Sequence, residues 1–111
     1  MEIAETRREG IVVLRLRGRL DASNAGTFAA RLRAAIEAGE RRIVVEGSEL
    51  AYVDSAGLQT LLVAAKALRP LAGRIVLAAL REPVGRIVDI AGLSSVFALY
   101  PTESDAVAAL R

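Results

Sequence analysis

Short runs of branched apolar residues alternate along this chain with stretches whose apolar side chains recur at helical spacing. Runs such as Ile-Val-Val at residues 43–45 have no polar alternation, which is typical of strands that are covered on both sides or lie centrally in a sheet. Gly47 and Ser48 are predicted to end that strand. The predicted strands cover residues 3–6, 11–16, 43–45, 75–78 and 96–99.

Helices are predicted between the later strands, each with a recognisable start or stop. In the first, Phe28, Leu32 and Ile36 fall on one helical face. Ser23 or Asn24 is expected to cap this helix, because short polar side chains accept first-turn N–H groups. The predicted helices run from 23 or 24 to 38, from 55 to 70, from 83 to 92, and from 102 to 110, where Thr102 and Asp105 resemble a capping box.

This order of elements predicts an α/β fold. Alternating strands and helices build a mostly parallel sheet through right-handed crossovers. Residues 8–10 separate the first two strands and predict a hairpin, so one antiparallel pair makes the sheet mixed. We therefore expect a single domain over residues 1–111, with about five strands and about four helices.

The residue types that are missing restrict the chemistry. The chain has no His, no Cys and no Trp. Without His or Cys it cannot form a Ser-His-Asp triad, a Cys/His zinc site or a disulfide. No glycine-rich phosphate loop is present either. We therefore expect a binding or regulatory protein, not an enzyme, without catalytic residues, metal ion or cofactor.

The charges and hydropathy bear on partners and location. The 15 Lys+Arg and 13 Asp+Glu are interleaved and leave a net charge of +2. A basic run is absent, which argues against direct nucleic-acid binding. No stretch approaches the roughly 18 apolar residues of a membrane span, and the N-terminus lacks the apolar core of a signal peptide. We expect a cytoplasmic protein without membrane insertion, and the oligomeric state stays open between monomer and weak dimer.

The most distinctive motif is Tyr-Val-Asp-Ser-Ala-Gly-Leu at residues 52–58, where a serine stands between a strand and a helix. The simplest interpretation of Ser55 is a helix N-cap, because its oxygen can accept a first-turn N–H. A nucleophilic role would need a base beside the hydroxyl. The chain has no His, and Lys66 lies about three turns further along the same helix.

Three blocks together resemble STAS domains, in particular bacterial anti-sigma factor antagonists. They are Val-Asp-Ser-Ala-Gly-Leu at 53–58, Gly-Arg-Leu-Asp at 18–21 followed by Asn-Ala at 24–25, and residues 83–93. Their order and spacing extend the resemblance over nearly the whole chain. Arg19 stands where the family commonly has Glu, Ala56 replaces a frequent second Ser, and residues 46–48 depart from its usual acidic-polar turn.

The resemblance implies partner switching. A serine kinase that is also the anti-sigma factor would bind this chain and phosphorylate Ser55, and a phosphatase would reverse the modification. Binding of the unmodified chain would release a sigma factor and so regulate transcription. The residues implied in partner binding are Asp21, Ser23, Asn24, Asp54, Ser55, Ala56, Gly57 and Gln59.

A second interpretation assigns the chain to a different class of function. The resemblance to STAS domains also allows a role as an interaction subunit of a lipid-transport ABC complex or as a regulator of another transporter. There the first two helices would dock permanently and Ser55 would serve only as a cap. In the same way, Asp21 could merely cap a turn and Asp54 could merely bind backbone N–H groups.

Overall fold

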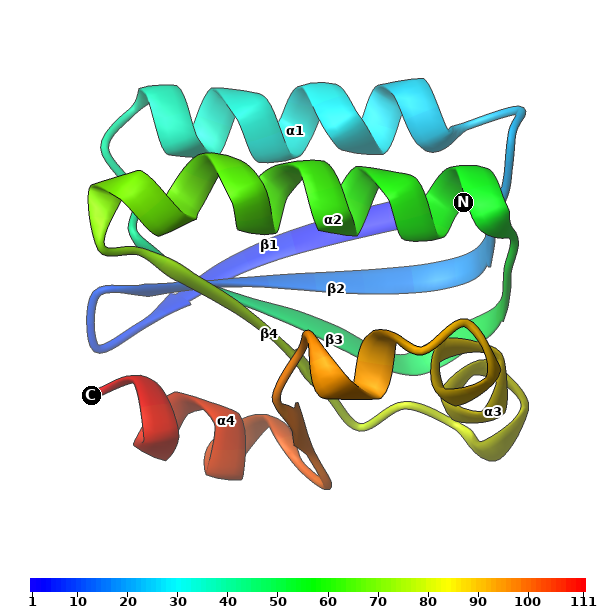
Figure 1. The fold of residues 1–111 in the computed structure, drawn as a ribbon. Coiled ribbons are helices and arrows are strands. Elements are labelled where there is room, and N and C mark those ends of the chain that lie inside the picture. Colours follow the sequence, from blue (N-terminus) through cyan, green and yellow to red (C-terminus); the bar gives the residue numbers. More distant parts are fainter.

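The computed structural model describes all residues from 1 to 111, and its centre is one five-stranded sheet (Figure 1). The strands lie in the order β1-β2-β3-β4-β5, with β1 antiparallel to β2 and every other pair parallel. This confirms the predicted mixed, mostly parallel sheet. The strands are β1 (Glu2–Arg8), β2 (Ile11–Leu20), β3 (Arg42–Val53), β4 (Arg74–Ala78) and β5 (Leu99–Tyr100).

Four α-helices cover the sheet, as predicted. They are α1 (Ala25–Glu37), α2 (Ser55–Leu68), α3 (Glu82–Ile90) and α4 (Glu103–Leu110), with short 3-10 turns η1 (Arg69–Leu71) and η2 (Leu93–Ser95). In Figure 1, α1 and α2 lie side by side on one face of the sheet and α4 lies on the other. None of the helices is both long and apolar enough to cross a membrane.

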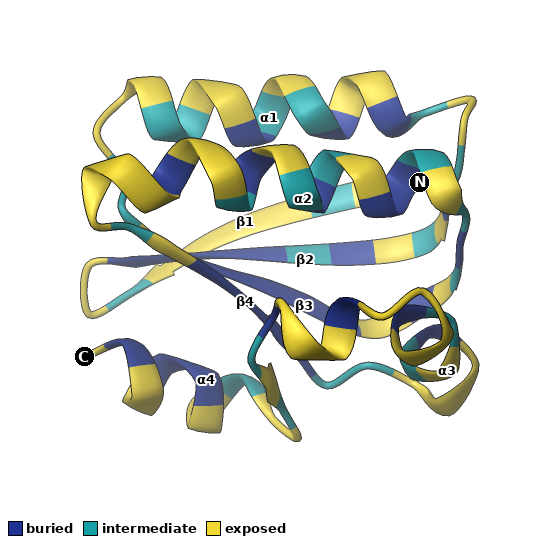
Figure 2. Ribbon diagram, viewed as in Figure 1, coloured by how far each residue is buried: buried dark blue, intermediate teal, exposed yellow.

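The two faces of β2 explain why its apolar run has no polar alternation. Val12, Leu14 and Leu16 enter the large core beneath α1, α2 and α3. Ile11 and Val13 enter a smaller core beneath α4. Because successive strand residues point to opposite faces, a strand covered on both sides must be apolar at consecutive positions. Figure 2 shows this burial in β2, β3 and β4, whereas most of β1 is exposed.

The third strand is longer than predicted. Gly47 and Ser48 do not end it, since β3 continues to Val53. The pairing with β2 shifts between Arg15 and Arg17, which face Glu46 and Glu49, so β3 accommodates an extra residue there. A bulge of this kind keeps a strand paired where its sequence indicates a break.

The prediction for residues 96–99 is also wrong in its placement. Residues 93–95 form η2, Val96 has right-handed helical backbone angles, and only Leu99 and Tyr100 pair with β4. Phe97 is buried in the large core, and hydrogen bonding to β4 begins only after it, with the N–H of Leu77 donating to the carbonyl of Ala98 at 3.1 Å. The predicted hairpin is confirmed: Glu9 and Gly10, both with positive φ, connect β1 to β2.

Candidate functional site at the start of α2

The site forms where β2 and β3 end at the same edge of the sheet. The two strands are parallel, and each is followed closely by a helix, α1 after Leu20 and α2 after Val53. The N–H of Asp54 donates to the carbonyl of Leu20 at 3.1 Å, which fastens the two strand ends together. Loops at the carboxyl edge of parallel strands are the usual place for binding sites in α/β folds.

Asp54, not Ser55, is the N-cap of α2. Its backbone is extended, and its Oδ1 accepts a hydrogen bond from the N–H of Gly57 at 2.9 Å. The other oxygen, Oδ2, accepts from the N–H of Ala22 at 3.0 Å. The N-cap interpretation of Ser55 is therefore wrong, because Ser55 is already the first helical residue. One carboxylate thus joins the start of α2 to the loop before α1.

Ser55 is exposed, and neither of those capping bonds uses its hydroxyl. Gln59, one turn further along α2, is exposed as well, and Ala56 is half-buried. Gly57 is buried: a Cβ there would lie 2.7 Å from Leu20 Cγ and 2.8 Å from Val53 Cγ2. Close packing against Leu20 and Val53 is therefore sufficient to explain why position 57 is a glycine.

The loop of residues 21–24 folds through short polar contacts. Asp21 Oδ1 accepts from the Ser23 N–H at 3.0 Å and from the Ser23 hydroxyl at 2.5 Å. The hydrogen bond from the Ser23 hydroxyl, followed by that from its backbone, holds the pKa of Asp21 below its ordinary value. Asp21 consequently carries its negative charge at neutral pH.

Asn24 occupies the N-cap position of α1 but makes no side-chain cap. Its Oδ1 accepts from the N–H of Asp21 at 3.0 Å, and its Nδ2 donates to the carbonyl of Arg19 at 2.8 Å. The predicted capping by Ser23 or Asn24 is wrong at this point, because both side chains are used to shape the preceding loop.

Two features of the site were not predicted. The guanidinium of Arg19 lies over the ring of Tyr52, 4.3 Å from its centroid, and 3.9 Å from an oxygen of Asp21. The second feature is the bond from Ala22 to Asp54 across 32 positions. Both features depend on the register of β2 against β3. That register shifts twice, between Arg15 and Arg17 and between Gly18 and Arg19, and the sequence did not predict these shifts.

The structure therefore brings Asp21, Ser23 and Asn24 next to Asp54 and Ser55, although the two segments are far apart in the chain. No group of three or more Asp or Glu side chains that could hold a metal ion occurs in residues 1–111. What the arrangement offers is an accessible hydroxyl at a helix N-terminus, beside two carboxylates fixed by hydrogen bonds.

Fold and site together define a small α/β binding domain with an accessible serine at the head of its second helix. The chain belongs to the STAS domain family, whose model matches residues 2–106.

Two named relatives are similar over the whole chain. BtrV of Bordetella bronchiseptica, a candidate anti-sigma factor antagonist, is 33% identical, over 100% of this chain and 96% of BtrV. An anti-sigma F factor antagonist of Paenibacillus polymyxa is 26% identical, over 100% of this chain and 96% of the relative.

The anti-sigma factor antagonist SpoIIAA is similar in structure. Its unphosphorylated form superposes with a TM-score of 0.83 at 26% identity, covering 96% of this chain and 93% of SpoIIAA. Its phosphorylated form, from Bacillus, superposes with a TM-score of 0.73 at 24% identity, covering 99% and 100% of the two chains.

Proposed function

We propose that this protein is an anti-sigma factor antagonist whose binding to an anti-sigma factor is ended by phosphorylation of Ser55. The observation that carries the proposal is the exposed position of Ser55 as the first residue of α2, beside the fixed carboxylate of Asp54. The names of the relatives support the same role. SpoIIAA, which shares the fold, has itself been solved in a phosphorylated form.

Phosphorylation at this position leaves the fold intact. The kinase transfers the γ-phosphoryl group of ATP to the Ser55 oxygen: that O–P bond forms, the bond to ADP breaks, and the hydroxyl proton leaves to a base of the kinase. The product carries about −1.5 to −2 charge at pH 7. The positive end of the α2 dipole and its free first-turn N–H groups favour an anion there.

The same charge disrupts the interface. Asp54 is adjacent in sequence, and its contact with Ala22 brings the loop of Asp21 to the same surface. A partner that buries this surface would desolvate the phosphate next to two carboxylates, which is costly. Because about 1.4 kcal/mol changes affinity tenfold, modest repulsion is enough to release the partner.

The other implied residues have distinct roles in the proposal. Exposed Ser23 and Gln59 contact the partner, while Ala56 leaves room for its approach. Asn24 and Gly57 act indirectly: Asn24 shapes the loop, and Gly57 lets α2 pack tightly on Leu20. A serine kinase that is the anti-sigma factor adds the phosphate, and a phosphatase removes it.

Affinity capture tests the interface. Tagged Ser55→Ala and Ser55→Asp variants are used to retrieve partners from the source cells, and the retained proteins are identified by mass spectrometry. We expect Ser55→Ala to retain an anti-sigma factor that Ser55→Asp binds at least tenfold more weakly. Ser104→Asp is the matched control: Ser104 is also an exposed first-turn serine, on α4, and its substitution should leave capture unchanged.

The purified partner then tests the modification. Incubation with ATP and Mg²⁺ should add one phosphate to the wild-type chain and none to Ser55→Ala. A phosphate on another residue would refute the assignment of Ser55. Equal partner sets for Ser55→Ala and Ser55→Asp would refute the switch, and an ATPase of a lipid-transport complex as the retained partner would favour the permanently docked alternative.

A further inference from the structure

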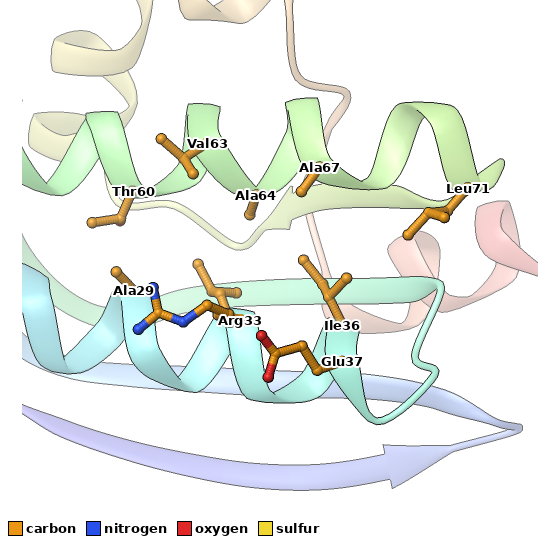
Figure 3. Close-up of a pocket in the computed structure, with 10 residues that line it drawn as sticks. Ala29, Arg33, Ile36, Glu37, Thr60, Val63, Ala64, Ala67 and Leu71 are labelled. Atoms are coloured by element: carbon orange, nitrogen blue, oxygen red, sulfur yellow. The ribbon is translucent and has the colours of Figure 1, made fainter.

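A second surface of α2 lies away from the serine site. A groove of about 320 Å³ runs between α1 and α2 toward their C-terminal ends, as Figure 3 shows. Leu32 and Ile36 of α1 and Ala64 of α2 are among its apolar lining residues. Because α2 rises about 1.5 Å per residue, Val63 lies about 12 Å along the axis from Ser55. The groove and the serine site can therefore be occupied independently.

The groove concentrates exposed apolar surface. Val63 and Leu71 both line it, and they are 55% and 44% exposed. Scattered apolar residues on a surface need no explanation, but large apolar side chains gathered at one groove indicate an interaction site. The apolar lining therefore fits a partner that presents apolar side chains of its own.

The rim of the groove carries one charge of each sign. Arg33 and Glu37 are one turn apart on α1, line the same groove, and form none of the ion pairs in the structure. By contrast, Arg31 on the same helix pairs with Glu5 at 3.2 Å. Arg33 and Glu37 are thus available to an external partner that offers an acid and a base at matching spacing.

One partner that offers this arrangement is a second copy of the chain. In a two-fold symmetric dimer every contact occurs twice: if one residue of the first copy contacts a given residue of the second, the same residue of the second copy contacts its counterpart in the first. If α1 packs antiparallel against α1 of the second copy, Arg33 of each copy meets Glu37 of the other. Val63 and Leu71 then come against the apolar lining of the opposite groove.

We propose that the α1–α2 groove is a self-association surface that forms a two-fold dimer through reciprocal Arg33–Glu37 pairs. This goes beyond the proposed function and does not depend on it. The two Ser55 sites remain accessible at the far ends of the α2 helices. The dimer is a weak one, since each copy contributes only a short groove and two exposed charges.

Charge reversal gives a sharp test by sedimentation equilibrium at low salt. The wild-type chain should associate between about 10 µM and 1 mM. Either Arg33→Glu or Glu37→Arg alone replaces both reciprocal ion pairs with contacts between like charges. Each single variant should therefore weaken association about tenfold. An equimolar mixture of the two variants restores both pairs in a heterodimer, as does the double variant in a homodimer, and both should associate like the wild type.

Two further variants serve as controls. Lys66→Glu changes the net charge as Arg33→Glu does, but Lys66 does not line the groove, so association should be unchanged. Val63→Asp should weaken association while its circular dichroism spectrum stays native, because Val63 is exposed. A wild-type chain that stays monomeric to 1 mM, or a mixture that fails to recover, would overturn the proposal, and so would saturable binding of another protein's amphipathic helix to a monomer.

Discussion

Asp54 and Ser55 are neighbours with separate tasks. The carboxylate of Asp54 is fixed by bonds to Gly57 and Ala22, so it holds the site together. Ser55 is exposed, and its hydroxyl takes part in neither of these bonds, which leaves it accessible for the phosphorylation proposed above. Because the structural task falls on the aspartate, modification of the serine need not disturb the helix start.

Gly57 is the residue at which the site is most sensitive to size. Gly57→Ala should lower the free energy of unfolding by about 1–3 kcal/mol, because the new methyl group overlaps Leu20 and Val53. Urea denaturation measures the change. Gly26→Ala is the control: a Cβ there meets nothing within 4 Å, and helical Ala should raise stability by up to about 1 kcal/mol. Equal stability of Gly57→Ala and the wild type would contradict the packing account.

At the scale of elements, ion pairs tie α4 to the sheet. Glu103 of α4 accepts from Arg8 of β1 at 2.8 Å and from Arg15 of β2 at 2.6 Å. Arg15 also contacts buried Glu46 of β3 at 2.8 Å. Four elements thus meet in one network beside the small core, and part of it is shielded from solvent.

Glu46 makes this network sensitive to acid. Burial raises its pKa, but hydrogen bonds from Ser48 and Arg15 outweigh burial and leave the pKa below the ordinary value. The folded state therefore binds the proton less readily than the unfolded state. The resulting stabilisation is present at pH values above the ordinary pKa of Glu46. It is lost as the pH falls through the lower pKa that Glu46 has in the folded state.

We expect Glu46→Gln to lower the free energy of unfolding at pH 7 by about 1–3 kcal/mol. The same variant should lose less stability than the wild type between about pH 5 and pH 3. Urea denaturation over this range measures both effects. Glu82→Gln is the control, since Glu82 is 79% exposed and pairs only with Arg86, so it should lose little at pH 7. A steeper acid loss in Glu46→Gln than in the wild type would contradict the assignment.

At the scale of the whole molecule, one sheet supports two cores of unequal size. The large core includes Phe28 and lies beneath α1, α2 and α3, and the small one contains Val107 and Leu110 of α4. Both cores use alternate residues of the same strands. Disruption of the strands on one face of the sheet therefore also disrupts the core on the other face. We therefore expect the domain to unfold in one cooperative transition.

Tyrosine fluorescence tests this expectation in a Tyr52→Phe background, where Tyr100, packed against the small core, is the remaining tyrosine. Its urea transition should coincide with that of far-ultraviolet circular dichroism. Leu110→Ala, which truncates a buried side chain of α4, should move both midpoints together and cost about 2–5 kcal/mol. An earlier transition of Tyr100 alone would show that α4 unfolds separately.

Predictions from the sequence succeeded where neighbouring residues decide the structure. The apolar stripe of Phe28 and Leu32, the hairpin at Glu9 and Gly10, and the cap of α4 by Thr102 are all present. The errors in the strands arose where distant contacts decide. β3 continues past Gly47 because β2 pairs with it, and strand pairing with β4 starts only at Leu99 because Phe97 packs into the large core.

The same division applies to the site and to the molecule. The sequence by itself determined the order of the elements and the Asp-Ser-Ala-Gly motif at a helix start, since periodicity and turn chemistry are local properties. The choice of Asp54 over Ser55 as the cap is also local, since the cap bond runs only to Gly57. Only the tertiary structure decided that residues 21–24 meet Asp54 and that Ser55 stays exposed. Those outcomes depend on the pairing of parallel strands far apart in the chain, where the extra residues in β3 shift the register from the one that uninterrupted alternation would give.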